Sequence, residues 1–228
     1  MSKTAFAADM KALDLLNLEG AVRALEQQGI DEFHFDVADG RFVEVFGFAP
    51  AAIAAVKAVS AIPCHAHLLV AQPERVLTAV LASGADTVTL HLEKCVHIHR
   101  ALSQIRDAGR QAGIAVLPAT PLTKVNYLFP QIDRLLLLGA DPVRRRGGLP
   151  RAAWERIRLL HENIRYHEYA VALEAEGAES AEDAARCIRF GASRVVVGPG
   201  AADGLADPER HAALREFVER VSAAVHTV

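Results

Sequence analysis

Paired cysteines, a surplus of charge of one sign and long apolar runs are all lacking in this chain, and each absence excludes a class of protein. Three cysteines in 228 residues cannot form a fully paired disulfide framework, and their spacing fits neither a zinc ribbon nor a redox pair, so we expect a reducing, cytoplasmic setting. The 25 Lys and Arg are balanced by 28 Asp and Glu, which leaves no basic surplus for binding nucleic acid. No apolar run is long enough to cross a bilayer and no signal-peptide core follows Met1, so we expect no membrane association.

The rest of the composition is typical of a folded protein. Apolar residues make up 51% of the chain and charged residues 23%, which excludes an intrinsically disordered polymer. The 15 glycines and 10 prolines exclude a collagen-like or low-complexity chain. The length suffices for one large core and no linker interrupts it, so we expect a single domain over residues 1–228.

Short apolar runs alternate with longer amphipathic segments, a pattern typical of parallel strands covered by helices. The predicted strands are Thr4–Ala7, Glu32–Val37, Cys64–Val70, Thr87–Leu92, Ile114–Leu117, Arg134–Gly139, Tyr169–Ala175 and Arg194–Val197. The predicted helices are Asn17–Gln28, Ala49–Val59, Pro73–Ala82, Val96–Ala112, Pro150–Ile164, Ser180–Phe190 and Pro208–Ala224. About 28 residues for each strand-helix unit predict an α/β fold, a single (β/α)₈ TIM barrel. A doubly wound open sheet is the alternative, which the lack of a glycine-rich nucleotide fingerprint after the first strand disfavours.

Glycine recurs where a predicted helix gives way to a strand. The positions are Gly29, Gly84, Gly113 and Gly191. Glycine readily adopts the left-handed conformation that ends a helix. We therefore expect all four to cap helices and turn the chain back into the sheet.

Polar pairs interrupt three of the apolar strands near their C-terminal ends. The pairs are His34 and Asp36, His65 and His67, and Glu174 and Glu176. Residues two apart share a face of a strand, and catalytic side chains of a barrel gather at this end. Buried ionisable groups are costly unless they are paired or bind a cation. Four of them form a candidate ligand set for Zn²⁺, Mn²⁺ or Fe²⁺: His34, Asp36, His67 and Glu176.

Each of these side chains also has an ordinary interpretation. A single buried histidine in a strand is usually a hydrogen-bonded core residue. Glu174 fits either a structural salt bridge or a substrate contact, and His91 fits either a supporting contact to the ligands or a place on the rim. The convergence of two histidines and two carboxylates from three strand ends favours the metal site.

Five segments, in consistent order between about residues 12 and 205, carry a resemblance to a known family. Residues 34–43 (HFDVADGRFV) look like the signature His-x-Asp-Val-Met-Asp-Gly-x-Phe-Val. Residues 67–70 (HLLV) are similar to His-Leu-Met-Val, and residues 117–122 (LPATPL) to Asn-Pro-x-Thr-Pro. Residues 173–177 (LEAEG) correspond to Leu-x-Val-Asp-Gly, and residues 198–200 (GPG) to a phosphate loop. The chain thus resembles the ribulose-phosphate 3-epimerase family.

The resemblance implies a (β/α)₈ barrel with one divalent metal ion, of which Zn²⁺, Fe²⁺, Mn²⁺ and Co²⁺ are the candidates. It assigns His34, Asp36, His67 and Glu176 as the ligands. It implies an isomerase of the pentose phosphate pathway that interconverts D-ribulose 5-phosphate and D-xylulose 5-phosphate through a metal-stabilised enediolate. Asp36 would be the base and Glu176 the opposing acid. The implied partner is a small phosphorylated sugar, and members of the family commonly form homo-oligomers.

The same resemblance points to phosphate-binding residues in two loops and after the seventh strand. These are Gly147, Gly148, Gly177, Gly198 and Gly200. To them we add Arg144, Arg145 and Arg146, which lie in a loop that departs from the family pattern. The family has Asn-Pro-Gly-x-Gly-Gly-Gln where this chain has residues 141–148 (DPVRRRGG). The three arginines fit either side-chain binding of a phosphate or carboxylate, or a solvated run of charge.

Several residues depart from the family pattern. Glu176 and His65 each stand where the family usually has Asp, and the methionines expected near the metal are replaced by Ala38, Leu69 and Leu138. These changes leave alternatives open. The chain could be an epimerase or isomerase of another ketose phosphate or of a sugar acid, an aldolase or decarboxylase of similar fold, or a barrel that has lost catalysis and serves binding or assembly.

Overall fold

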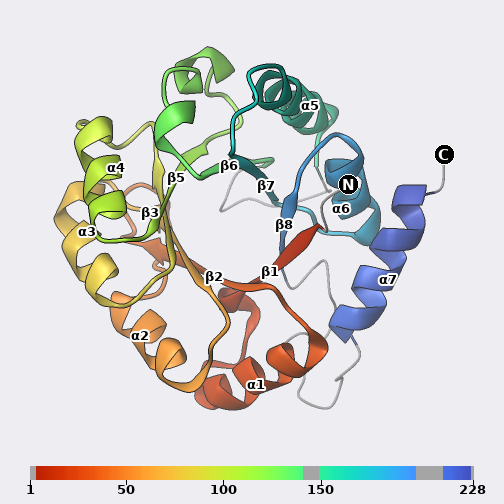
Figure 1. Ribbon diagram of the computed structural model, residues 1–228. Coiled ribbons are helices and arrows are strands. Elements are labelled where there is room, and N and C mark those ends of the chain that lie inside the picture. Colours follow the sequence, from red (N-terminus) through yellow and green to blue (C-terminus); the bar gives the residue numbers. More distant parts are fainter. Residues whose placement is uncertain (1–3, 141–148, 199–212, 227–228) are drawn as a thin grey trace.

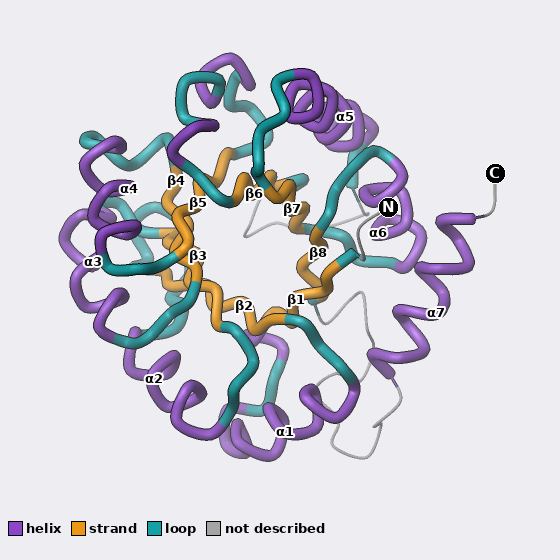
Figure 2. Tube along the Cα trace, in the orientation of Figure 1, coloured by secondary structure: helices purple, strands orange, loops and turns teal. Residues whose placement is uncertain are grey.

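The computed structural model describes residues 4–140, 149–198 and 213–226, and within them eight parallel strands close into a barrel in chain order (Figure 1). The strands are β1 (Ala5–Asp9), β2 (Glu32–Ala38), β3 (Cys64–Leu69), β4 (Thr87–His91), β5 (Gln111–Val116), β6 (Arg134–Leu138), β7 (Ala172–Glu176) and β8 (Arg194–Val197). The helices are α1 (Leu18–Gln28), α2 (Pro50–Val59), α3 (Pro73–Ala82), α4 (Ile98–Asp107), α5 (Arg151–Tyr166), α6 (Ala181–Arg189) and α7 (Ala213–His226). The helices surround the strands on the outside (Figure 2). The predicted α/β fold, a TIM barrel, is confirmed.

The strands read as continuous apolar runs because both of their faces are buried. In β6 every residue is buried. Leu135 and Leu137 belong to the large core between sheet and helices, whereas Leu136 and Leu138 belong to a small cluster inside the barrel. Alternation along the strand therefore places every second side chain in the barrel interior, where the polar pairs also lie.

One predicted helix boundary is wrong. α4 ends at Asp107, and Gly109, with φ of 72°, turns the chain into β5, which begins at Gln111. Gly113 consequently lies within β5, where an added Cβ would stand 2.2 Å from Thr89 Oγ1, so its role is close packing inside the barrel. The other three glycines do cap helices, with φ of 83° at Gly29, 87° at Gly84 and 111° at Gly191.

Two strands differ from the prediction in ways that affect the site. β1 continues beyond Ala7 to Asp9, which brings an acidic side chain to the C-terminal mouth of the barrel. β7 begins at Ala172 rather than Tyr169 and ends at Glu176 rather than Ala175. Tyr169 instead stacks on Phe129, with 4.9 Å between ring centroids.

Some predictions fall on residues that the structure does not describe. Arg144, Arg145, Arg146, Gly147, Gly148 and Gly200 lie outside the described residues, as does the predicted helix start at Pro208. All three cysteines are described, and they are free and buried. In the described ranges, none of the helices combines the length and apolar character that a membrane span requires.

Candidate metal centre and active site

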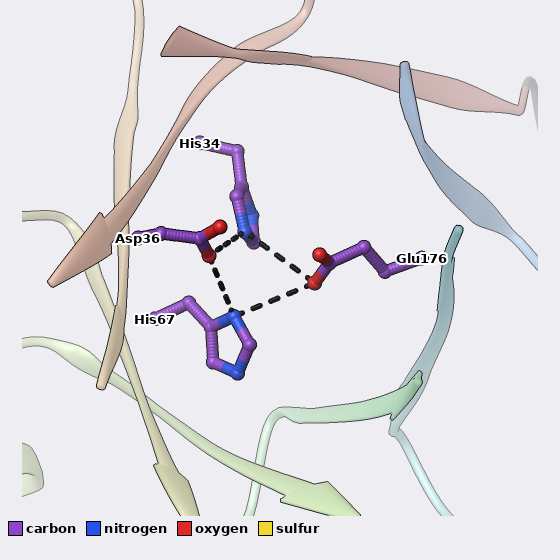
Figure 3. Close-up of side chains that lie close together, drawn as sticks. All are labelled: His34, Asp36, His67 and Glu176. Atoms are coloured by element: carbon purple, nitrogen blue, oxygen red, sulfur yellow. Dashed lines mark hydrogen bonds and ion pairs between the residues drawn. The ribbon is translucent and has the colours of Figure 1, made fainter. Parts of the chain in front are cut away.

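The structure brings the four candidate ligands together at the C-terminal mouth of the barrel (Figure 3). β2 and β3 pair in a register that sets Asp36 opposite His67, while β7 carries Glu176 from another part of the closed sheet. One ligand atom of each residue lies within 4.8 Å of the other three, and all four side chains are buried. The imidazoles of His34 and His67 thus point into the barrel toward a common point.

The contacts within this group are short. Asp36 Oδ1 lies 3.1 Å from His34 Nε2 and 3.0 Å from His67 Nδ1. Glu176 Oε2 lies 3.6 Å from His34 Nε2 and 3.4 Å from His67 Nδ1. The two imidazole nitrogens are therefore held between two carboxylates (Figure 3).

The electrostatics of the group favour positive charge at its centre. Burial by itself lowers the pKa of His67, but the carboxylates of Asp36 and Glu176 outweigh it and raise that pKa to about 9. The pKa of His34 is raised for the same reason, against its own burial. Burial would raise the pKa of Asp36, yet hydrogen bonds from both histidines and the charge of Lys11 hold it well below its usual range. The carboxylates thus stabilise a cation at this place, whether it is a proton or a metal ion.

The donor set fits a divalent metal ion. Two imidazole nitrogens and two carboxylate oxygens are the mixed ligands that Zn²⁺, Mn²⁺, Fe²⁺ and Co²⁺ accept. A second group, made of His34, His65 and Glu174, also has its ligand atoms within 4.8 Å of one another. There, however, Arg134 Nη1 lies 3.1 Å from His65 Nδ1 and 3.3 Å from Glu174 Oε2, so a guanidinium already provides the cation. Of the two groups found among the described residues, the one that contains His67 and Glu176 is therefore the better suited to a metal ion.

Lys11 is a site residue that sequence reasoning missed. Its ammonium lies 2.7 Å from Asp36 Oδ2 and 2.8 Å from Asp9 Oδ2, and therefore bridges the ends of β1 and β2. Burial raises the pKa of Asp9, and Lys11 opposes that effect. The sequence does hold a signal for this part of the site. Asp9 lies two residues after Ala7, so in a first strand that continues to Asp9 both side chains face the barrel interior.

Glu174 belongs to a buried ion network below the candidate metal centre. Arg134 Nη1 and Nη2 lie 2.6 Å and 3.0 Å from the two carboxylate oxygens of Glu32, and Arg194 Nη2 lies 2.9 Å from Glu32 Oε2. With Glu174 at 3.3 Å from Arg134, the network sets two guanidinium groups against two carboxylates. Of the two interpretations of Glu174, the structure supports the salt bridge.

His91 and three glycines also lie at the mouth of the barrel. His91 is fully buried, and its Nε2 lies 3.0 Å from His67 Nε2, so it supports a ligand instead of lying on the rim. Gly177 follows β7 with φ of 102°, and Gly198 is buried directly after β8. Gly47 lies so close to β2 that an added Cβ would stand 2.1 Å from the Asp36 carbonyl oxygen. The loop after β2 is thereby packed against the strand that carries two of the candidate ligands.

Comparison with a solved structure supports the fold. A mutant tryptophan synthase alpha-subunit from Pyrococcus furiosus matches with a TM-score of 0.68, and the match covers 96% of this chain and 98% of that chain. The sequence identity is 14%, so this likeness concerns the barrel alone.

Comparison with curated sequences leads to a family. A ribulose-phosphate 3-epimerase from Bacillus subtilis (strain 168) is 32% identical over 136 residues, which are 60% of this chain and 63% of the relative. The chloroplastic ribulose-5-phosphate-3-epimerase of Arabidopsis thaliana is 30% identical over 179 residues, 78% of this chain and 64% of the relative. These matches span less than two thirds of the relatives' own length. The model of the ribulose-phosphate 3 epimerase family matches residues 5–201, and the chain belongs to that family.

Proposed function

We propose that this protein is a metal-dependent isomerase that inverts the C3 centre of a ketose phosphate and interconverts D-ribulose 5-phosphate and D-xylulose 5-phosphate. The observation that carries the proposal is the placement of Asp36 and Glu176. Their carboxylates come from different strands and flank one pair of imidazoles, with ligand atoms inside a 4.8 Å limit. Inversion requires such a pair, because one group must remove a proton from one face and another must return a proton to the opposite face.

His34, Asp36, His67 and Glu176 would hold the ion. When bound, the ion supplies positive charge that stabilises the enediolate formed on loss of the C3 proton. Asp36 takes that proton in one direction, and Glu176 delivers a proton to the other face. The roles exchange in the reverse reaction, and no net gain or loss of protons results.

Lys11 orients the base. Its contact of 2.7 Å with Asp36 Oδ2 leaves Oδ1 directed toward the two histidines. The side chain of Lys11 is 38% exposed, so its ammonium lies where the site meets solvent. An ammonium there also adds a positive charge within reach of an anionic substrate.

Proton exchange tests the proposal. Metal-loaded protein is incubated with D-ribulose 5-phosphate in D₂O, and deuterium at C3 is followed by NMR, with Zn²⁺, Mn²⁺, Fe²⁺ and Co²⁺ tested in turn. We expect incorporation with at least one metal, and a loss of about 100-fold or more in Asp36→Asn. Asp107→Asn, an exposed carboxylate in α4, is the control and should keep full activity. No incorporation with any metal would reject the pentose substrate, and exchange restricted to another ketose phosphate or a sugar acid would redirect the assignment.

Two further properties accompany this proposal. We place the enzyme in the cytoplasm, which the free, buried thiols of its three cysteines support. We also expect it to form a homo-oligomer, as its family resemblance implies, and light scattering of the purified protein would measure the state directly. Purified protein that contains no metal by elemental analysis and binds none on titration would instead support a non-catalytic barrel.

A further inference from the structure

Each imidazole of the candidate metal centre contacts a second buried histidine. His34 Nδ1 lies 3.2 Å from His65 Nδ1, and His67 Nε2 lies 3.0 Å from His91 Nε2. In both cases the nitrogen used is the one that does not face Asp36. Since each contact joins two ring nitrogens, one ring must donate and the other must accept.

Arg134 decides the direction of the first contact. Its Nη1 lies 3.1 Å from His65 Nδ1, and a guanidinium can only donate, so this nitrogen of His65 must accept. The proton of the His65 ring is then on Nε2, which donates to Thr89 Oγ1 at 2.7 Å. Gly113 makes room for this hydroxyl, because any larger residue would place a Cβ 2.2 Å from it.

The tautomer of His34 follows from that of His65. Because His65 Nδ1 accepts, His34 Nδ1 carries the proton and donates it. In the neutral ring that would bind a metal, the lone pair of His34 is then on Nε2, the nitrogen 3.1 Å from Asp36 Oδ1, where the ion would take the place of the proton that otherwise bonds to this carboxylate. A neutral imidazole ligand needs its lone pair on the side of the metal.

Glu93 decides the direction of the second contact. An ionised carboxylate can only accept, so His91 Nδ1 donates to Glu93 Oε2 at 3.0 Å. Glu93 is itself fixed by the Thr120 hydroxyl and by the backbone N–H of Leu117, the latter at 2.8 Å. The neutral His91 ring is then left with an accepting Nε2.

The tautomer of His67 follows in turn. Its Nε2 carries the proton and donates to His91 Nε2, so in the neutral ring that would bind a metal the lone pair is on Nδ1. That nitrogen lies 3.0 Å from Asp36 Oδ1 and 3.4 Å from Glu176 Oε2. One series of hydrogen bonds begins at the guanidinium of Arg134 and the other at the carboxylate of Glu93. Although these groups have opposite charges, both series leave an imidazole lone pair directed at the candidate metal centre.

We propose that His65 and His91 are positioning residues that fix the tautomers of the two imidazole ligands, so that His34 binds the metal through Nε2 and His67 through Nδ1. The inference rests on the proposed metal centre. Outer partners of this kind commonly contribute 10-fold to 100-fold to metal affinity. Because His65 and His91 are neutral imidazoles, they orient the two ligand histidines without adding a further negative charge beside Asp36 and Glu176.

The test reads the tautomers directly. In Zn²⁺-loaded protein labelled with ¹⁵N-histidine, long-range ¹H–¹⁵N spectra should show His34 protonated on Nδ1 and His67 protonated on Nε2. Zn²⁺ affinity, measured by competition with a chelator, should fall about 10-fold to 100-fold in His65→Leu. His65→Asn should recover most of it, because Arg134 would hold the amide oxygen at the position of the accepting nitrogen. Thr87→Val, a buried polar-to-apolar change in the same barrel, is the control and should bind as the wild type does.

The possible failures are distinct. Coordination of His34 through Nδ1, or of His67 through Nε2, would overturn the inference while leaving the metal centre in place. His65→Leu that binds Zn²⁺ as tightly as the wild type would overturn it as well. A wild-type protein that binds no metal would overturn both the inference and the metal centre. Should His65→Leu not fold, the wild-type spectra decide the question alone.

Discussion

Replacing Arg134 by methionine isolates the contribution of the buried ion network. Arg134 is 3% exposed, contacts both carboxylate oxygens of Glu32 and also reaches Glu174. Methionine fills much of the same volume but leaves buried carboxylates without their shared cation. Breaking a buried ion pair by removing one partner costs about 3–5 kcal/mol.

The charge of the neighbouring Arg194 determines how much of this free energy of unfolding is lost in Arg134→Met. Arg194 remains 2.9 Å from Glu32 and continues to neutralise it, so the main loss is at Glu174. We therefore expect a value near the lower end, about 3 kcal/mol. For a chain of 228 residues this corresponds to a fall of roughly 6 °C in Tm.

Calorimetry or thermal unfolding followed by circular dichroism measures this fall. The matched control is Arg158→Met, whose exposed guanidinium pairs with Glu155 and Glu162 on the surface and should leave Tm unchanged. Adding Glu174→Gln to Arg134→Met should recover part of the loss, because the stranded carboxylate is then removed. A fall below about 2 °C, or one no larger than in the control, would refute the reasoning.

Three further predictions concern the mouth of the barrel. Burial would raise the pKa of Glu93, but the hydrogen bonds that its carboxylate accepts lower that pKa from 4.5 to about 2. The ionised Glu93 therefore stabilises the fold above pH 4.5, and this stabilisation is lost as the pH falls toward 2. The difference in urea midpoint between the wild type and Glu93→Gln should accordingly shrink from pH 5 to pH 3. Gly47→Ala should reduce exchange activity about 100-fold by displacing the Asp36 backbone. Gly109→Ala, just before β5, strains a left-handed residue with φ of 72° and should lower stability without lowering activity, so equal activities of the two variants would contradict this. Zn²⁺ at about 100 times its Kd should stabilise the wild type by about 2.7 kcal/mol and should not stabilise His67→Ala in a thermal scan.

Local patterns sufficed to predict the barrel and its four candidate ligands. The periodicity of apolar residues located every strand, and parity along a strand put His34 and Asp36 on one face. The predicted end of a helix was wrong where two nearby glycines could each have ended it. The helix predicted to reach Ala112 ends at Asp107, because Gly109 adopts a left-handed conformation and so ends the helix earlier than Gly113 would have done.

The supporting contacts could not be predicted in this way. Lys11 meets Asp36 across 25 positions, and Arg134 meets Glu32 across 102 positions. No periodicity joins residues so far apart, since only closure of the sheet and the stagger of its strands bring them into one layer. The sequence alone determined which side chains face the barrel interior, because that depends on alternation within each strand. The tertiary structure alone decided which of them meet, and with that the cations beside Asp36, Glu32 and Glu174 and the contacts of the two candidate imidazole ligands.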